Sequence, residues 1–381
     1  MRAHLVVAAS WISSIGFASG IEFPSNATEI FGPFVHDNGT LSAWMSTYPD
    51  ETPLTQINIP GTHDSATWNY TQATQDALAN LTAGDGEPMY PPEVFRCQSA
   101  SIMDSLSAGV RFFDLRFALD PAGTKLVFWH SQALLSERAT VEDVVTAFYY
   151  WLDLHPSETV ILSFQYETST TVNATFDATV QHLIFDILNS TTAAEYIDQT
   201  HDYLPTLGEA RGKAVLFKRF DLDELPEEYE AALPGLHLSP SLWTDDSRDI
   251  SLTYNTVLNL TAYIEDYYEP DDLGDNSTAA ANIAAKVNAT ASHLAKATSG
   301  SSDYDGSLFI TFASAEHNTA LPVAVTPQGM ALGTGNSSTP LGGVNQQILP
   351  VIQSLKGERI GIVVVDFWDE PGDLIESILG S

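Results

Sequence analysis

Titratable and polar side chains stand at the ends of several short apolar runs in this 381-residue sequence. His63 and Asp64 follow the run that stops at Pro60-Gly61, and His130 closes another run. Further groups at run ends are Asp114, Arg116, Gln165, Glu167, Lys218, Arg219, Glu265, Asp266, His317 and Asp366. Two imidazoles can move protons near neutral pH, and a guanidinium can hold an anion. The inventory indicates acid–base chemistry on an anionic substrate, although a polar surface loop would also explain His63 and Asp64 taken alone.

Asp366 follows the apolar run at residues 360–365, which has the composition of a strand inside the fold. An unpaired carboxylate there would be costly, so Asp366 needs a partner. If the strands close into a barrel, the last strand neighbours the first and brings Asp366 to His63. A carboxylate on one imidazole nitrogen fixes the tautomer and raises the basicity of the other nitrogen. An ordinary structural ion pair is the alternative.

Eight apolar runs are typical of strands that are covered on both faces. They occupy residues 54–59, 110–117, 126–130, 158–164, 213–219, 259–265, 307–313 and 359–367. Helical patterns lie between several of them, at about 98–108, 173–189, 277–298 and 343–355 and in a helix that begins with a Thr140–Asp143 capping box and ends at His155-Pro156. This alternation predicts an α/β fold, a (β/α)8 TIM-type barrel with room for irregularity.

The carboxyl ends of barrel strands meet at one mouth, so the groups named above should converge there. Segments 71–96, 221–258 and 314–342 are rich in turn-forming residues, and we expect them to be long loops at that rim. Because Pro-Gly interrupts a ladder, we expect the first strand to end there and Thr62–Ser65 to leave the sheet. An open doubly wound sheet is the alternative, but no glycine-rich phosphate loop follows the first run.

The first 20 residues are predicted to be a signal peptide, because Arg2 precedes an apolar run that ends in Ala18-Ser19-Gly20. An irregular lead-in over 21–50 and a single barrel domain over 51–381 are expected to follow. Ten Asn-x-Ser/Thr sequons favour a secreted, N-glycosylated, extracellular protein. They begin at Asn26, Asn38, Asn69, Asn80, Asn173, Asn189, Asn259, Asn276, Asn288 and Asn336. Cys97 is the only cysteine, which excludes an intrachain disulfide and makes packing its expected role.

The composition is strongly acidic, with 15 Lys and Arg against 49 Asp and Glu and a net charge of −34. Nucleic acid is therefore excluded as a partner. An anionic bilayer would also repel the chain, so we expect at most transient peripheral membrane contact. We expect a monomer.

Several of these stretches together resemble the X domain of phosphatidylinositol-specific phospholipase C, and more closely its metal-independent bacterial type. The resemblance spans most of residues 52–370. Its main pieces are Pro60–Ser65, Gly109–Arg116, Trp129-His130 and Glu158–Ser163, with weaker pieces at Arg211–Arg219 and Glu265–Tyr268. The order and spacing of these pieces carry the resemblance, since each piece alone is unspecific.

The resemblance implies roles for particular residues. His63 would be the general base and His130 the general acid, with Asp366 supporting His63, Asp64 supporting His130, and Arg116 holding the phosphate. Residues expected to bind inositol hydroxyls are Glu167, Arg219, Asp266 and Tyr268. The implied reaction is attack by the inositol 2-hydroxyl on the phosphodiester, which gives inositol 1,2-cyclic phosphate. Implied substrates are phosphatidylinositol, glycosylphosphatidylinositol or glycerophosphoinositol.

We predict no metal and no other cofactor. Calcium-dependent members of the family have carboxylates or amides at the places of Asp64, Asp114, Arg116 and Gln165, whereas here the third is a cation. The lysine that bacterial members place near Glu167 is missing, because Gln165 and Tyr166 fill that stretch. Alternatives are a metal-dependent glycerophosphodiesterase or sphingomyelinase D-like barrel, and a glycosylated binding protein whose catalysis has lapsed.

Overall fold

The computed structural model describes residues 20–37, 39–82, 89–168, 170–171, 173–270, 277–317 and 325–380. Apart from Gly20, the predicted signal peptide lies outside the described residues, as do the sequon residues Asn38 and Asn276. The lead-in that we expected to be irregular contains short helical turns at Ser25–Ala27 and Leu41–Thr47 and the helix α1 (Thr28–Phe31). These turns are held by apolar packing, since the Phe31 ring lies 5.0 Å from that of Phe148.

Eight parallel strands form the wall of a barrel, as predicted. In sheet order they are β7 (Leu236–His237), β6 (Ala214–Arg219), β5 (Val160–Tyr166), β2 (Phe112–Leu119), β1 (Ile59–Thr62), β11 (Ile362–Val365), β10 (Leu308–Phe312) and β9 (Leu260–Asp266). β8 (Ser247–Asn255) adds to β9 in antiparallel orientation. Among the described residues the hydrogen-bonded path ends at β7 and β8, so the barrel is nearly closed.

One of the eight predicted barrel strands was wrong. The run 126–130 is β3 (Leu126–His130), which pairs antiparallel with the far end of β2 and with β4 (Ala133–Leu134). The missing barrel strand is β7, which lies in the segment 221–258 that we expected to be a loop, together with β8 and α9 (Glu227–Ala232). A two-residue strand has no apolar periodicity to detect, and an apolar run does not reveal the direction of its partner.

The first strand does not end at Pro60-Gly61, contrary to the prediction. β1 pairs with both neighbours through these residues, and the apolar stretch before it includes a helical turn at Leu54–Gln56. Pro60 fits because its carbonyl still accepts from Arg111 N, while Ile59 and His63 donate to the carbonyls of Gly361 and Val365 on the other side. A side chain at Gly61 would lie 2.8 Å from the Phe112 ring, so the barrel interior requires glycine there.

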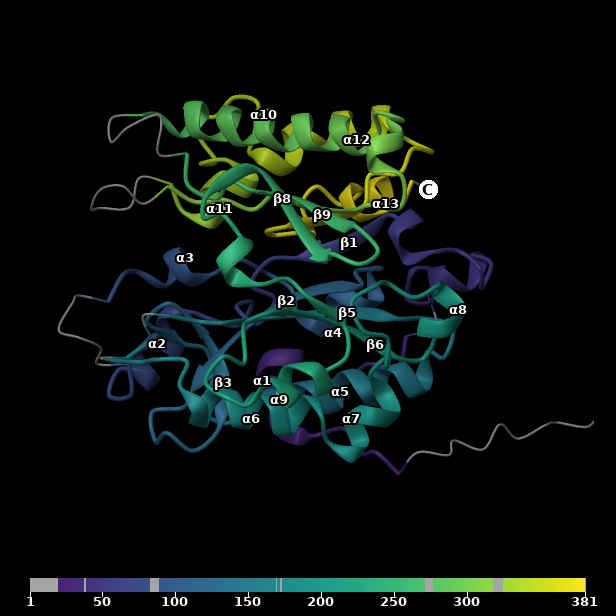
Figure 1. Cartoon of the computed structure of the whole chain (residues 1–381). Coiled ribbons are helices and arrows are strands. Elements are labelled where there is room, and N and C mark those ends of the chain that lie inside the picture. The colour runs from purple at the N-terminus through teal and green to yellow at the C-terminus, as the bar shows by residue number, and fades with distance from the viewer. Residues whose placement is uncertain are drawn as a thin grey trace, which may run out of the picture.

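Helices cover the outside of the barrel. Figure 1 shows α10 (Ala279–Ala297) and α12 (Val344–Ser354) along one side and α5 (Val141–Leu154), α6 (Ala178–Leu188) and α7 (Thr191–Tyr196) on the opposite side. The predicted Thr140–Asp143 capping box at the start of α5 is confirmed. The remaining helices are α2 (Gln72–Leu78), α3 (Pro92–Phe95), α4 (Ile102–Ser107), α8 (Leu207–Ala210), α11 (Pro327–Leu332) and α13 (Leu374–Leu379).

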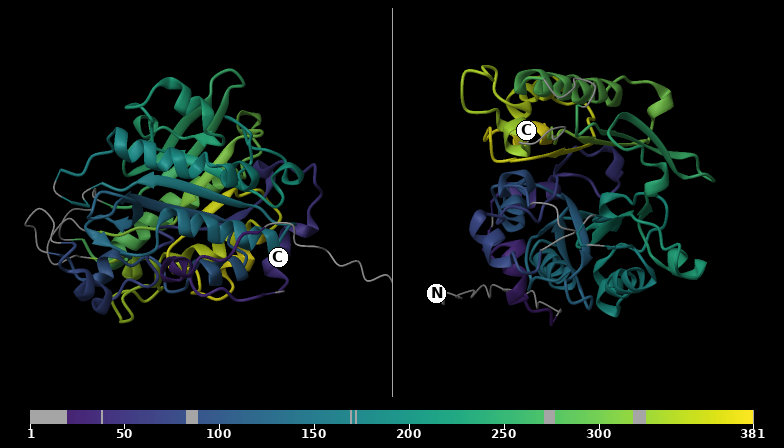
Figure 2. Two further views of the ribbon diagram at one scale, coloured as in Figure 1. Left: turned by 90° about the horizontal axis from the view of Figure 1, so that it is seen from below. Right: turned by 90° about the vertical axis from the view of Figure 1, so that its left-hand side faces the viewer.

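The barrel interior is a packed core rather than a channel. Alternate strand residues such as Phe112, Ile161, Phe217, Ile310 and Val364 are buried within one apolar cluster. The views in Figure 2 show the helices outside this ring of strands, where separate apolar clusters fill the space between sheet and helices. Polar chemistry is therefore confined to the ends of the strands.

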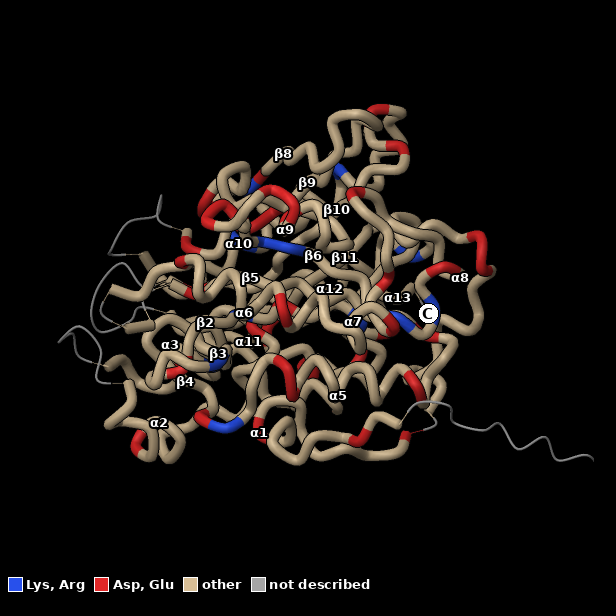
Figure 3. Tube along the Cα trace, turned by 60° about the horizontal axis from the view of Figure 1, so that its bottom comes forward, with Lys and Arg blue, Asp and Glu red and all other residues tan. Residues whose placement is uncertain are grey.

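Acidic positions are spread along the chain trace in Figure 3, while basic positions are fewer and scattered. In the described part of the chain, no helix combines the length and apolar character needed to cross a bilayer.

Candidate active site

A cavity of about 460 Å³ opens at the carboxyl ends of the barrel strands. Eight of the nine predicted site residues line it, and the ninth, Asp64, is buried beneath them. These eight are His63, Arg116, His130, Glu167, Arg219, Asp266, Tyr268 and Asp366. The strand order explains the convergence, because β1 lies between β2 and β11 and so places His63 between Arg116 and Asp366.

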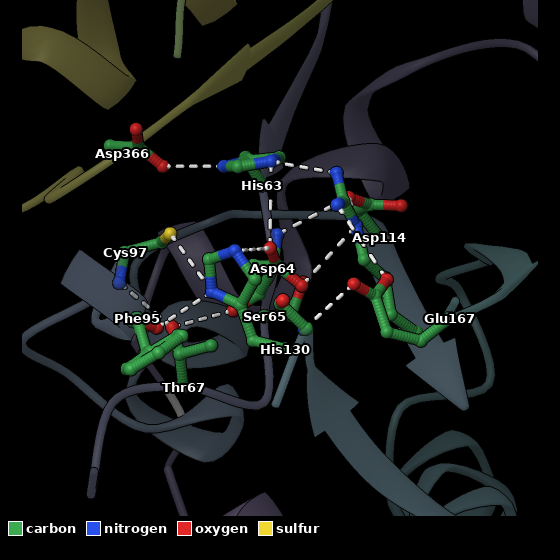
Figure 4. A network of polar contacts seen from close by, with 12 residues as sticks. His63, Asp64, Ser65, Thr67, Phe95, Cys97, Asp114, His130, Glu167 and Asp366 are labelled. Atoms are coloured by element: carbon green, nitrogen blue, oxygen red, sulfur yellow. Dashed lines mark hydrogen bonds and ion pairs between the residues drawn. The ribbon is translucent and has the colours of Figure 1, made fainter. Parts of the chain in front are cut away.

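His63 and Asp366 form the predicted pair. Nδ1 of His63 lies 2.9 Å from Oδ1 of Asp366, whose side chain is 1% exposed (Figure 4). Asn345 donates to the Asp366 carbonyl and so anchors the turn after β11. Burial by itself would lower the pKa of His63, but the carboxylates of Asp366 and Asp64 outweigh it and raise the pKa to about 9. The pair therefore favours a strongly basic imidazole.

Arg116 is held at the centre of the site. Its Nη2 lies 2.8 Å from His63 Nε2, and its Nε lies 3.3 Å from both Asp64 Oδ1 and Asp114 Oδ2. Burial would lower the pKa of Arg116, but Asp64 and Asp114 raise it well above its ordinary value, so the guanidinium stays charged. A fixed positive charge beside two imidazoles suits a phosphate group.

Asp64 lies between the two histidines. Its Oδ2 is 3.6 Å from His63 Nε2 and 3.5 Å from His130 Nε2, and its backbone adopts a left-handed conformation (φ 42°). The other ring nitrogen of His130, Nδ1, lies 2.8 Å from the Phe95 carbonyl. Because a carbonyl only accepts, Nδ1 carries a proton and the Nε2 edge faces the site. The sequence could not predict that the Phe95 carbonyl orients the His130 ring, because every residue has a carbonyl.

Alternation along the strands separates two other candidates from the site. Arg219 and Asp266 face the cavity, whereas their neighbours Lys218 and Glu265 point outward and pair with Glu230 at 2.8 Å and Lys286 at 2.6 Å. The last strand-end candidate, His317, is fully buried and contacts Ser277 at 3.3 Å, and it does not line the cavity.

Trp243 organises the side of the cavity where inositol binding was predicted. The Arg219 guanidinium lies 3.9 Å from the Trp243 ring centre, and Trp243 Nε1 donates to Asp266 Oδ2 at 2.7 Å. Arg219 also contacts Asp114 Oδ1 at 3.3 Å and is 3.8 Å from Asp266 Oδ2. Positive and negative groups thus lie side by side on this wall of the cavity.

The cavity is also lined by residues outside the predicted site residues, among them Trp243, Asp245 and Glu316. Trp243 was predicted to lie in a loop, where an aromatic residue has no distinguishing pattern. Asp245 accepts from the Tyr268 hydroxyl at 2.8 Å, a contact between the chain after β9 and the chain before β8 that only folding creates.

Glu167, a predicted site residue, accepts from the Ser131 amide at 2.7 Å and so links β5 to the turn after His130.

Cys97 lies in the wall of the cavity and is fully buried. Burial and the nearby Asp366 and Asp64 raise the pKa of its thiol well above the ordinary value, so it is no nucleophile. Its sulfur is 4.0 Å from His130 Nδ1, which goes beyond the packing role expected from the sequence. Asp64 and Asp114 both contact Arg116, which argues against a hard cation between them.

The fold and site together define a (β/α) barrel protein in which two histidines, an arginine and several carboxylates meet at the carboxyl ends of the strands. Residues 94–220 match the family model described as phosphatidylinositol-specific phospholipase C, X domain. A 1-phosphatidylinositol phosphodiesterase of Staphylococcus aureus (strain Newman) is 25% identical over 347 residues, which cover 89% of this chain and 93% of that protein. One of Listeria monocytogenes is 29% identical over 182 residues, 48% of this chain and 50% of that protein.

Solved structures agree on the fold. A mutant phosphatidylinositol-specific phospholipase C from Staphylococcus aureus superposes with a TM-score of 0.65 at 22% identity, covering 90% of this chain and 97% of that one. The Listeria monocytogenes enzyme gives 0.57 at 21% identity, covering 89% and 97%. Residues 94–220 are thus similar to the X domain of phosphatidylinositol-specific phospholipase C, and the predicted resemblance to its bacterial members is confirmed.

Proposed function

We propose that this protein is a secreted, N-glycosylated phosphodiesterase that cleaves inositol phosphodiesters without a metal. The observation that carries the proposal is the meeting of His63, Arg116 and His130 around the buried Asp64. The names of the bacterial relatives, 1-phosphatidylinositol phosphodiesterase, support the same activity.

His63 is the proposed general base. With Nδ1–H donated to Asp366, Nε2 has a free lone pair that Arg116 occupies in the absence of substrate. A bound phosphodiester attracts the guanidinium to its nonbridging oxygens and leaves Nε2 to accept the proton of the inositol 2-hydroxyl. That oxygen attacks phosphorus, and Asp366 stabilises the imidazolium that forms.

His130 is the proposed general acid. Its Nδ1–H is engaged by the Phe95 carbonyl, so the proton is delivered from Nε2, the edge that faces Asp64 at 3.5 Å. Transfer of this proton to the leaving alkoxide releases diacylglycerol or another alcohol and leaves inositol 1,2-cyclic phosphate. Proton transfers of this kind typically contribute about 10²- to 10⁴-fold to the rate.

The substrate is held by its head group. Arg219, Asp266 and Tyr268, with Glu167 on the opposite wall, offer donors and acceptors to inositol hydroxyls. The net charge of −34 disfavours lasting contact with anionic bilayers, so glycosylphosphatidylinositol or a soluble glycerophosphoinositol is the preferred substrate. The protein meets membranes transiently and acts as a monomer.

Secretion and glycosylation are supported by the positions of the sequons. The eight sequon asparagines within the described residues are all exposed, and none of these eight lines the cavity. Sugars at these positions would leave the mouth open. A mass decrease on treatment with peptide N-glycosidase of protein from the culture medium would support this part of the proposal, and an unglycosylated intracellular product would refute it.

Phosphorus NMR of the reaction products with chelator in excess tests the activity. We expect the resonance of a five-membered cyclic phosphate to grow from phosphatidylinositol, glycosylphosphatidylinositol or glycerophosphoinositol. Loss of turnover in chelator would favour the metal-dependent alternatives. Binding of inositol without any cleavage would favour the binding-protein alternative.

A further inference from the structure

The proposed reaction assigns no role to Cys97, although its thiol lies near both catalytic pairs, His63 with Asp366 and His130 with Asp64. Two sets of three ligand atoms share this sulfur, one from His63, Cys97 and Asp366 and the other from Asp64, Cys97 and His130. Within each set the atoms lie within 4.8 Å of one another. Imidazole nitrogen, thiolate sulfur and carboxylate oxygen are the ligands that Zn²⁺ takes in proteins.

A second observation favours the set that includes His63. Asp366 is 1% exposed, and its Oδ2 atom has no hydrogen-bond partner among the described residues, while Oδ1 accepts from His63 Nδ1. In Figure 4 the Cys97 sulfur lies on the Asp366 side of the His63 ring. Arg116 contacts the opposite ring nitrogen, so the ring separates the guanidinium from a cation bound on the Asp366 side. By contrast, in the other set His130 Nδ1 is engaged by Phe95.

We propose that His63, Cys97 and Asp366 form an inhibitory binding site for Zn²⁺. Three protein ligands and one water complete the four-coordinate geometry that zinc prefers. The thiol proton is released to solvent, and the charges of the thiolate and the carboxylate balance that of the ion. Hard cations such as Mg²⁺ and Ca²⁺ avoid a sulfur ligand, so the site selects against them.

Zinc would inhibit by changing the state of the base, an effect that rests on the proposed function. Coordination through Nδ1 removes the proton that His63 donates to Asp366. The ring proton then resides on Nε2, which can no longer accept from the inositol hydroxyl or from Arg116. One bound ion therefore removes the base and the carboxylate that supports it.

Binding can be measured without any substrate. Zn²⁺ and Co²⁺ are titrated into the wild type and into Cys97→Ala, Asp366→Asn and His237→Ala, with thermal unfolding to verify that each variant folds. His237 is the matched control, because it forms a His–Asp pair of 2.7 Å with Asp221 away from the catalytic cavity. We expect one zinc per wild-type chain, a thiolate-to-cobalt charge-transfer band, and at least about tenfold weaker binding in Cys97→Ala and Asp366→Asn. Equal zinc affinity in wild type and Cys97→Ala, or no sulfur band, would overturn the site.

The activity measurement separates the two proposals. Zn²⁺, but not Mg²⁺ or Ca²⁺, should inhibit cleavage and chelator should restore it, and Cys97→Ala should need at least about tenfold more zinc relative to its own zinc-free rate. Zinc binding at Cys97 in a protein that cleaves no inositol phosphodiester would refute the proposed function and leave the site standing. Active enzyme that zinc does not inhibit would refute the inhibitory role.

Discussion

His63 Nε2 lies 2.8 Å from Arg116 Nη2, and this contact excludes a proton on Nε2. A guanidinium has donors only, so the imidazole nitrogen must accept. The nearby carboxylates favour the opposite state, since Asp366 and Asp64 raise the pKa of His63 to about 9. Protonation of His63 at Nε2 and its contact with Arg116 therefore compete.

Catalysis should consequently depend on pH through both histidines. Because His63 must lose a proton to act as the base while His130 must keep one to act as the acid, kcat/KM should pass through a maximum, with the limb that reports His63 near pH 9. Asp366→Asn removes the charge that raises this pKa, so that limb should move to lower pH while the maximal rate falls. A pH series on soluble glycerophosphoinositol measures both effects. An unchanged limb in Asp366→Asn would contradict the assignment.

Removal of either imidazole should abolish most of the turnover. We expect His63→Ala and His130→Ala each to lower kcat by at least about 10²-fold, the typical contribution of a proton transfer. Neither should unfold the protein, because both side chains are partly exposed at the mouth. His182→Ala, an exposed histidine on α6, is the control. Wild-type rates in His63→Ala or His130→Ala, measured by release of cyclic phosphate, would remove these roles.

Arg116→Lys should be a poor substitute despite its retained charge. The guanidinium contacts Asp64 and Asp114 through Nε and His63 through Nη2, and an ammonium cannot keep this planar arrangement on two phosphate oxygens. We expect a loss of at least about tenfold in kcat, by analogy with the removal of single oxyanion donors. Arg138→Lys, at a largely exposed pair with Glu29, should retain full activity.

Trp243 should affect substrate binding more than the chemical step. Trp243→Ala removes the ring beside Arg219 and the hydrogen bond to Asp266, and stacked and hydrogen-bonded contacts of this kind are each worth about 1 kcal/mol. KM for glycerophosphoinositol should therefore rise by up to about 30-fold with a smaller change in kcat. Trp243→Phe keeps the ring and should lie between the two. A fall in kcat at constant KM would contradict a positioning role.

One pair within the family motifs is structural. Arg111 and Glu158 are fully buried and lie 2.8 Å apart, and Arg111 also donates to the carbonyls of Ser42 and Leu106. Glu158→Ala leaves the guanidinium unpaired and should lower the free energy of unfolding by about 3–5 kcal/mol. Urea denaturation measures this loss, and the exposed Glu195→Ala should change it little. Equal stability of the two variants would show that the pair contributes nothing.

The sequence predicted the barrel because buried parallel strands are continuously apolar, a signal that survives without knowledge of neighbours. The same signal failed at β3 and β7 because it carries no information about neighbouring strands. The direction of β3 depends on its partner β2, and β7 has only the two residues Leu236 and His237 in the sheet. A Pro-Gly pair usually ends a strand. Here the carbonyl of Pro60 still accepts a hydrogen bond, and the lack of a side chain at Gly61 lets β1 fit between its two neighbouring strands.

Residue types at strand ends singled out His63, Arg116, His130 and Asp366, which the fold brings to one cavity. Their mutual distances were not contained in the chain, because residues 63 and 366 meet only when β1 pairs with β11. Tertiary structure alone placed the Phe95 carbonyl on His130, Trp243 beside Arg219 and the Cys97 thiol between the catalytic pairs. Such contacts join loops far apart in sequence, and a carbonyl, an aromatic ring or a single thiol carries no pattern until folding supplies its neighbour.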